Sequence, residues 1–391
     1  MRRTLRPLAT AALGAAAFGT CAPQLATAAD AANQTHAASW ADTLAAWGLA
    51  VNGYVAASYY DSNGYPANVH QFDVDHDTFQ LDQAGLTVAY QPKQGFGGLV
   101  DLMAGEDARV LHQAQDGHDE SIDLRQAYIQ YATGPLTVIA GEYVTLAGAE
   151  VINPTQNTNF SRSLLFTFAE PLTHTGVRAT FALSDTVSLI AGVNDGWNTT
   201  STSYGSKTGE AGIAWTPGKT FSLAAQAYLG KFGATPPGGL DGERSLIDVV
   251  ATYNATAALT FIVNADWDRQ DQASGPGTAS ASWYGLAGYA NYAFNPRWRV
   301  SLRGEYLDDR DGFLTSAMAL AGYSGPTSGQ HLWEGTVTLG YAPVEHFELR
   351  LEGRYDSAQT DLFLRERAVG AAPAQFAASL SEIAVQGVLK F

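Results

Sequence analysis

Apolar side chains occupy every second position in a long succession of segments between Trp47 and the C-terminal Phe391. Side chains of an extended strand point alternately to opposite faces, so this period of two predicts strands that each have one apolar face. We count sixteen such segments, an even number. The predicted strands cover residues 47–60, 77–91, 96–105, 121–133, 135–145, 173–184, 186–196, 206–216, 219–231, 244–255, 257–268, 281–294, 297–310, 331–343, 346–357 and 380–391.

The opposite face of several segments is too charged for a protein core. In residues 346–357, Phe347, Leu349 and Leu351 alternate with a run of five charged side chains. These are Glu348, Arg350, Glu352, Arg354 and Asp356. Burying unpaired ions is costly, so this face must meet water while the apolar face meets something else.

The connections between the segments alternate between tight turns and long loops. The long ones are residues 61–76, 106–120, 146–172, 197–205, 232–243, 269–280, 311–330 and 358–379. This layout predicts a transmembrane antiparallel β-barrel of about 16 strands, with short periplasmic turns, long extracellular loops and both termini on the periplasmic side. A soluble β-sandwich or propeller could give the same alternation of residues, but rarely the same alternation of loop lengths. The mean hydropathy of -0.09, with no long apolar run after the N-terminal region, excludes a bundle of membrane helices.

The N-terminus has the features of a secretory signal. Arg2, Arg3 and Arg6 precede an Ala-rich apolar stretch, and small residues surround Ala28, which predicts a signal peptide over 1–28. The single cysteine, Cys21, lies inside that segment. We expect residues 29–46 to form an N-terminal periplasmic segment and residues 47–391 to form an outer-membrane β-barrel.

The charge of the mature chain argues against nucleic acid as a partner. Removing the three arginines of the signal leaves 22 − 3 = 19 basic residues against 38 acidic ones, a formal charge of −19. Phosphate binding requires the opposite sign. We expect no cofactor either.

Four segments in the middle of the chain resemble the OmpL-like family of β-barrel porins. They are Ala147–Asn153, Asn159–Phe166, Ala169–Arg178 and Gly192–Trp197. The last strand, ending in Phe391, is similar to the strand that outer-membrane insertion machinery reads. The resemblance implies a channel for passive diffusion of small hydrophilic solutes or ions, located in the bacterial outer membrane in contact with lipid and lipopolysaccharide. A homotrimer is an expectation by analogy with other sixteen-stranded porins.

A barrel of this size has a lumen wide enough for water, so inward side chains would line a pore. The predicted pore-lining residues are Asp101, Arg178, Asp248, Asp266, Arg299, Arg303, Glu305, Glu348, Arg350, Glu352 and Arg354. The arginines Arg299, Arg303, Arg350 and Arg354 come from neighbouring hairpins and would suit a constriction that orients polar or anionic solutes. The alternative is that Arg and Glu pair laterally merely to satisfy a wet wall.

The loop 146–172 is the longest and contains an apolar stretch, Leu164–Phe168, that needs a surface to lie against. We expect it to fold into the barrel and to place Glu150, Arg162 or Glu170 opposite the basic wall. The competing interpretation is that it packs over the mouth or against a neighbouring subunit.

Acidic and histidine residues gather in the first loop and suggest a divalent-cation site. They are His70, Asp73, Asp75, His76 and Asp77. A calcium loop would need Gly where Thr78 stands and Glu where Ala84 stands, so we favour a solvated acidic loop and predict no metal site.

Two other classes of function stay open. His174 with Ser161 or Ser163 is the one plausible start of a barrel-embedded hydrolase, although we predict no enzyme. An adhesin or structural barrel is the other alternative. Arg125 is unassigned, because the apolar pattern of residues 121–133 changes faces, as a bulge or the membrane boundary would cause.

Overall fold

The computed structural model describes residues 44, 46–66, 69–115, 119–201, 207–231, 242–273, 278–315, 329–366 and 374–391. The predicted signal peptide, 1–28, and almost all of the predicted periplasmic segment, 29–46, lie outside these described residues. No helix in the described ranges is long and apolar enough to cross a membrane.

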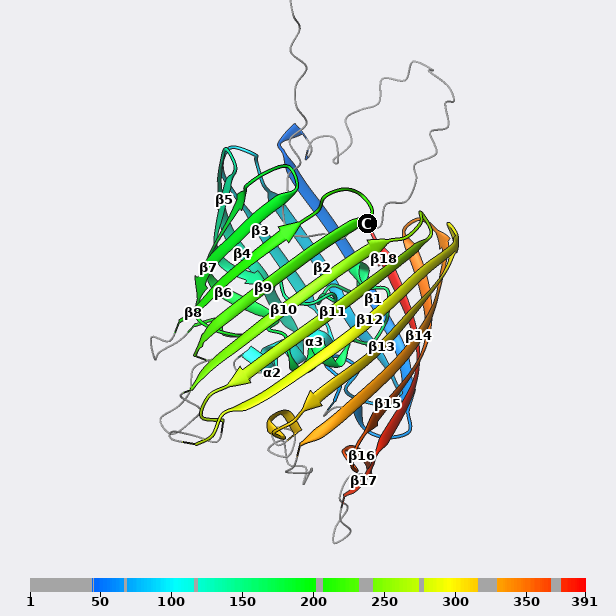
Figure 1. The fold of residues 1–391 in the computed structure, drawn as a ribbon. Helices are drawn as coiled ribbons and strands as arrows, with labels where there is room; N and C mark the ends of the chain where they lie inside the picture. The colour runs from blue at the N-terminus through cyan, green and yellow to red at the C-terminus, as the bar shows by residue number, and fades with distance from the viewer. Residues whose placement is uncertain are drawn as a thin grey trace, which may run out of the picture.

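Sixteen antiparallel strands of the described residues form a closed barrel (Figure 1). Each barrel strand pairs with the barrel strands before and after it in the chain, and β1 pairs with β18 to close the barrel. The strands are β1 (Leu49–Ser62), β2 (Thr78–Tyr90), β3 (Gly95–Ala104), β4 (Ile122–Thr133), β5 (Leu136–Val144), β6 (Thr173–Ala182), β7 (Val187–Asn194), β8 (Thr208–Trp215), β9 (Phe221–Lys231), β10 (Glu243–Asn254), β11 (Leu259–Gln270), β12 (Ala281–Asn295), β13 (Trp298–Asp309), β14 (Gln330–Val344), β15 (Phe347–Ala358) and β18 (Ser379–Lys390). Each boundary lies within two residues of the predicted one, so the sixteen-stranded barrel is confirmed.

The barrel closes between its first and last strands. Phe391 N–H donates to the Gly53 carbonyl over 2.9 Å, and Gly53 N–H donates back to the Phe391 carbonyl over 2.8 Å. Gly53 has no side chain, and a Cβ at this position would collide with the Phe391 ring. The C-terminus lies on the rim of the short turns, and the small hairpin of β16 (Phe363–Glu366) and β17 (Gln375–Ala377) lies on the rim of the long loops (Figure 1).

The outer surface is apolar and the inner surface is polar. In β15, Leu351 is 48% exposed while its neighbours Glu352 and Arg350 are 2% and 3% exposed. Exposed aromatic residues also occur close to both rims, as an outer-membrane barrel requires. The side chains that would meet lipid are therefore the apolar ones that the period of two predicted.

β-bulges in β4 and β2 interrupt the alternation within the barrel wall. In β4, Leu124 and Arg125 together face Leu102 of β3, so the apolar pattern changes parity and Arg125 points inward with 3% exposure. In β2, a register shift makes Asp82 and Gln83 both buried. A bulge places one extra residue in a strand and redirects a side chain. This explains why Arg125 fitted neither face of the predicted strand.

Segments from the long loops fill part of the barrel interior (Figure 1). Helix α2 (Glu106–Gln115) packs against β2, β3 and β4, and helix α3 (Leu164–Phe168) packs against β12 and β13. A short 3-10 helix, η2 (Pro154–Gln156), lies near β18. The helices η2 and α3 belong to the loop between β5 and β6.

Candidate functional site

Residues 145–172, which we call loop 3, connect β5 to β6 and lie inside the barrel. Asn153 caps η2, and the Ser163 hydroxyl caps α3 by accepting the N–H of Phe166 over 2.9 Å. The cap directs the apolar side chains of α3 to the wall, where Leu164 and Leu165 are fully buried against Trp283 of β12 and Leu307 of β13. Loop 3 thus occupies the lumen instead of packing over the mouth.

Four arginines of the wall, which we call the arginine row, hold the backbone of loop 3. They are Arg299 and Arg303 of β13 and Arg350 and Arg354 of β15. Arg299 donates to the Thr158 carbonyl over 2.7 Å, Arg303 to the Ser161 carbonyl over 2.9 Å and Arg354 to the Arg162 carbonyl over 2.6 Å. Arg350 donates to the carbonyls of Pro154 and Asn157 over 3.1 Å and 3.0 Å.

Carboxylates of the same wall accept the N–H groups of loop 3. Glu352 of β15 accepts the N–H of Phe160 over 2.6 Å and that of Ser161 over 2.9 Å. Glu150, within loop 3, accepts the N–H of Ser163 over 2.6 Å and also pairs with Arg303. The carbonyls of loop 3 therefore accept hydrogen bonds from arginines, and its N–H groups donate to carboxylates. Hydrogen bonds with a charged partner are stronger than those between neutral groups.

The contact covers most of the arginine row. Arg303, Arg350 and Arg354 are each 3% exposed, whereas the Arg299 and Glu348 side chains are 21% and 19% exposed. We expected the four arginines to orient solutes at a constriction. Three of them lie beneath loop 3, and the partly exposed ion pair is Arg299–Glu348, with Nε and Oε1 separated by 2.6 Å.

The other predicted pore-lining residues also point inward and are mostly paired along the wall. Arg178 of β6 forms a bidentate ion pair with Glu210 of β8, with hydrogen bonds of 2.7 Å and 3.0 Å. Asp101 of β3 accepts two hydrogen bonds from Arg125, at 2.8 Å and 2.9 Å. Glu305 lies 3.1 Å from Arg303 and accepts the N–H of Leu165 over 3.3 Å. Lateral pairing and loop anchoring thus occur together.

Several inward charged residues of this network were missing from our predicted set. They are Arg125, Glu210, Glu334 and Glu382. The last three alternate with apolar residues on the outer face, as Glu334 does with Trp333, so the period of two could have identified them. Arg125 could not be found this way, because the bulge in β4 inverts the pattern beside it.

The three residues predicted to face the basic wall occupy different surroundings. Glu150 pairs with Arg303 at 2.8 Å. The Arg162 guanidinium donates to carbonyls of loop 3 itself, those of Val151, Ile152 and Phe160. Glu170 lies instead beside Asp248 of β10 and Asp266 of β11. Burial raises the pKa of its carboxyl well above the usual range, and the negative charges of Asp248 and Glu150 raise it further.

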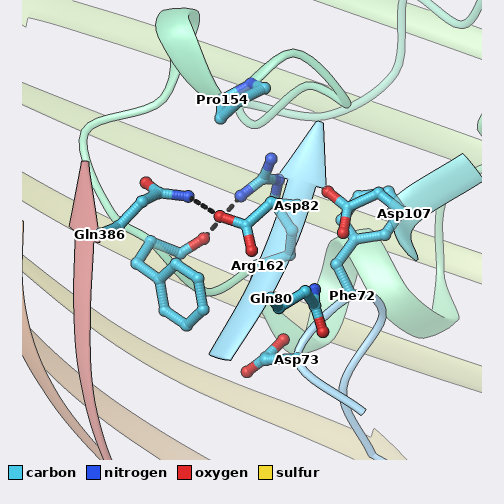
Figure 2. A pocket seen from close by; sticks show the side chains of 9 residues that line it. Phe72, Asp73, Gln80, Asp82, Asp107, Pro154, Arg162 and Gln386 are labelled. Carbon is cyan, nitrogen blue, oxygen red and sulfur yellow. Dashed lines mark hydrogen bonds between the residues drawn. The ribbon is translucent and has the colours of Figure 1, made fainter. Parts of the chain in front are cut away.

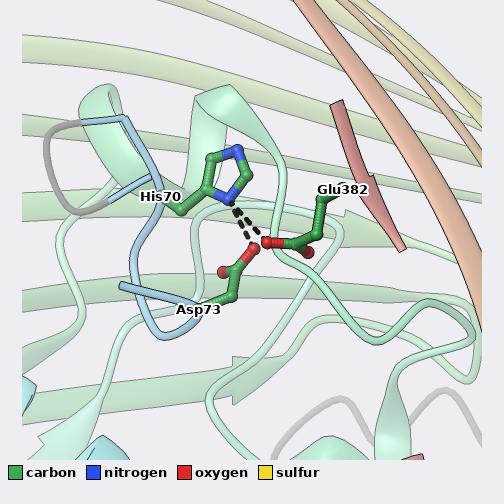
Figure 3. A group of neighbouring side chains, drawn as sticks. All are labelled: His70, Asp73 and Glu382. Carbon is green, nitrogen blue, oxygen red and sulfur yellow. Dashed lines mark ion pairs between the residues drawn. The ribbon is translucent and has the colours of Figure 1, made fainter. Parts of the chain in front are cut away.

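The first long loop also enters the barrel, so the expectation of a solvated loop is wrong for His70 and Asp73, which are 4% and 2% exposed. His70 Nδ1 lies 2.5 Å from Asp73 and 3.8 Å from Glu382 of β18 (Figure 3). On the other side of the ring, Nε2 lies 3.1 Å from Asp356 of β15. Burial and Arg354 lower the pKa of His70, but Asp73 and Asp356 outweigh them and raise it overall. A protonated His70 would therefore join three carboxylates.

A small cavity separates loop 3 from β2 and α2 (Figure 2). Its volume is about 10 Å³, room for roughly one water molecule. Asp82 and Asp107 line it together with Arg162, and Gln386 of β18 donates to Asp82 over 2.8 Å. Burial, followed by the charge of Asp82, raises the pKa of Asp107 well above its usual range. The cavity is too small for an organic solute.

The candidate hydrolase residues have other partners. His174 Nδ1 donates to the Gly196 carbonyl over 3.0 Å, and its ring stacks on Tyr228 with the ring centres 5.0 Å apart. The Ser161 hydroxyl accepts from Arg303 over 2.9 Å, and Ser163 caps α3. Both serines thus serve the placement of loop 3.

Comparison with known proteins identifies relatives of the whole barrel. The family described as "Putative beta-barrel porin-2, OmpL-like" matches residues 48–384. A search of curated proteins gave no match.

Among the solved structures that share the fold are three outer-membrane proteins. The outer membrane channel DcaP of Acinetobacter baumannii has 14% identity and a TM-score of 0.57, with 88% of this chain and 97% of that chain covered. The anion-selective porin from Comamonas acidovorans has 12% identity and a TM-score of 0.59, covering 88% and 99%. The trimer form of OmpT from Vibrio cholerae has 10% identity and a TM-score of 0.59, also covering 88% and 99%.

Proposed function

This chain belongs to the OmpL-like family of β-barrel porins, and we propose that loop 3 sets the width of the passage through its channel. The protein is a porin of the bacterial outer membrane that passes small hydrophilic solutes or ions by diffusion. Loop 3 occupies lumen space that solutes would otherwise use. Its position is fixed by the arginine row, while the partly exposed Arg299–Glu348 pair meets the solute.

One observation carries this proposal: the backbone of loop 3 is bonded to charged side chains of the wall from Pro154 to Leu165. If loop 3 left the lumen, its carbonyls and N–H groups would lose their hydrogen bonds to charged side chains, which are roughly twice as strong as hydrogen bonds between neutral groups. Loop 3 is therefore a fixed part of the channel.

Single-channel recording in planar lipid bilayers tests both the channel activity of the barrel and the role of loop 3. The parent protein is expected to conduct KCl, and deletion of residues 155–168 is expected to increase the conductance by widening the lumen. An unchanged conductance after the deletion would refute the role of loop 3. A parent barrel that inserts but never conducts would refute the channel and favour a structural barrel or adhesin.

We further propose that the barrel has no hydrolase activity. Membership of a porin family favours a channel over an enzyme, and the contacts of His174, Ser161 and Ser163 support structural roles. Assays of phospholipid and peptide hydrolysis on the folded parent, with His174→Ala as the comparison, test this. Hydrolysis by the parent that His174→Ala abolishes would overturn the proposal.

A homotrimer is also proposed, by analogy with the trimer form of OmpT. The apolar outer surface would contact outer-membrane lipid and lipopolysaccharide, and Phe391 at the end of the last strand would be read by the insertion machinery. Mass measurement of the protein in detergent tests the trimer. Loss of membrane insertion in a Phe391 deletion tests the role of the C-terminus.

A further inference from the structure

Three buried carboxylates converge where the end of loop 3 meets the wall. Glu170 comes from loop 3, Asp248 from β10 and Asp266 from β11. One carboxylate oxygen of each lies within 4.8 Å of the others. Their exposed fractions are 5%, 0% and 4%, so all three are largely shielded from bulk water.

These carboxylates lack a cation, unlike the carboxylates that the arginine row and its neighbours hold. Elsewhere, Glu150, Glu334 and Asp356 each have an arginine partner. Among the described residues, no lysine, arginine or histidine forms an ion pair with Glu170, Asp248 or Asp266. Both oxygens of Glu170, Oδ1 of Asp248 and Oδ2 of Asp266 have no hydrogen-bond donor. Three like charges this close, without a counter-charge, require bound protons or a bound cation.

The backbone of loop 3 makes room for the Glu170 carboxylate. Gly148 has a φ of +88°, in the left-handed region that favours glycine, and a Cβ there would collide with both carboxylate oxygens of Glu170. The next N–H, that of Ala149, donates to Asn264 Oδ1 over 2.8 Å, and Asn264 donates to Asp248 Oδ2 over 2.8 Å. Asp248 is therefore held in place, Glu170 has room beside Gly148, and both carboxylates keep oxygens without a donor.

The donor set indicates which cation would fit. All three groups are carboxylates, hard oxygen ligands that suit calcium or magnesium better than zinc or copper. The ligands come from a loop and two strands, and such an irregular arrangement suits Ca²⁺, whose coordination is flexible, better than Mg²⁺, which demands octahedral geometry.

We propose that Glu170, Asp248 and Asp266 bind one Ca²⁺ ion, which ties the C-terminal end of loop 3 to β10 and β11. The ion would supply the positive charge that the arginine row supplies at the other end of the loop. The cluster of His70, Asp73 and Glu382 is a weaker candidate, because His70 and the nearby Arg354 already provide cations there.

Calcium titration of the folded protein tests the proposal without reference to channel activity. The mature chain, refolded from inclusion bodies to exclude lipopolysaccharide and stripped with EGTA, is titrated with CaCl₂ by calorimetry in detergent. We expect saturable binding of one Ca²⁺ per chain and tighter binding of Ca²⁺ than of Mg²⁺. Binding should be lost in Glu170→Gln and retained in Asp185→Asn, a change in an exposed periplasmic turn.

Folding of every variant is checked by its mobility in unheated SDS gels. If Glu170→Gln does not fold, Asp266→Asn replaces it, with the same expected loss. A folded parent that binds no Ca²⁺ saturably would overturn the proposal, as would stoichiometric binding that survives these substitutions. The parent should also unfold at a higher temperature with Ca²⁺ than with EGTA, since an ion that binds only the folded state stabilises it.

Discussion

Arg303 Nη1 donates to Glu150 Oε1 over 2.8 Å and thereby joins β13 to a loop that begins more than a hundred residues earlier. The same guanidinium reaches Glu334 at 3.1 Å and the Ser161 carbonyl at 2.9 Å. Arg303 is thus the common partner of the wall and loop 3. The placement of the loop depends on buried charge as much as on the apolar packing of α3.

Replacing Arg303 and Arg354 together by alanine is expected to release loop 3 and raise single-channel conductance. The substitutions leave Glu150, Glu334 and Asp356 buried without these partners. Breaking a buried ion pair by removing one partner costs about 3–5 kcal/mol. Conductance in planar bilayers and the free energy of unfolding in urea measure the two effects.

Arg269→Ala is the matched control for the released loop, because Arg269 is half-exposed at the end of β11 and contacts Asp271 and Ser280, outside loop 3. Its conductance and stability should stay at the parent values. A double variant that folds, inserts and conducts like the parent would show that the arginine row does not hold loop 3.

The Arg299–Glu348 pair is expected to control ion selectivity, because it is the part of the row that keeps contact with water. Glu348→Gln should shift the reversal potential in a KCl gradient towards anion selectivity, and Arg299→Ala should shift it towards cation selectivity. Both shifts should shrink at high salt, since mobile ions screen exposed charges. Equal reversal potentials for the two variants would contradict this assignment.

Stability should depend on pH through His70. Its pKa is raised in the folded state, after burial and Arg354 are outweighed by Asp73 and Asp356. The stabilisation is therefore fully present below the unfolded pKa of about 6.5 and is lost as pH rises through the folded pKa. Urea unfolding at fixed calcium should show a fall in the free energy of unfolding of the parent above this pH, and a smaller fall in His70→Gln.

His346→Gln separates this effect from general histidine titration, because His346 is exposed in a periplasmic turn. It should keep the pH dependence of the parent. If His70→Gln and the parent lose the same free energy over this pH range, the proton on His70 does not hold the first loop in the barrel.

The strands could be predicted from sequence because membrane and lumen impose opposite polarity on alternate residues. Leu349, Leu351 and Glu352 occupy the faces that the pattern assigned to them. The partners of inward charges could not be predicted in the same way. Arg303 meets Glu150 only because loop 3 folds back into the barrel, and sequence periodicity contains no information on where a loop returns.

Bulges limit such predictions for a different reason. One extra residue in β4 inverts the pattern for the rest of the strand, so Ile122 and Ile129 are both outward although their separation is odd. The prediction left Arg125 unassigned on this account. The residue pairs with Asp101 at 2.7 Å and is fully enclosed, so it belongs to the inner network.

Arg125 should therefore be as important for stability as the arginine row. Arg125→Ala removes two hydrogen bonds to Asp101 and one to the Tyr54 hydroxyl, and it leaves Asp101 buried without a cation. The expected loss in the free energy of unfolding is about 3–5 kcal/mol. Arg125→Lys keeps the charge but not the planar fork, so it should recover part of that loss. Urea unfolding of both variants in detergent measures the difference. An Arg125→Ala barrel as stable as the parent would show that the Arg125–Asp101 pair, which the bulge places in the lumen, does not stabilise the barrel.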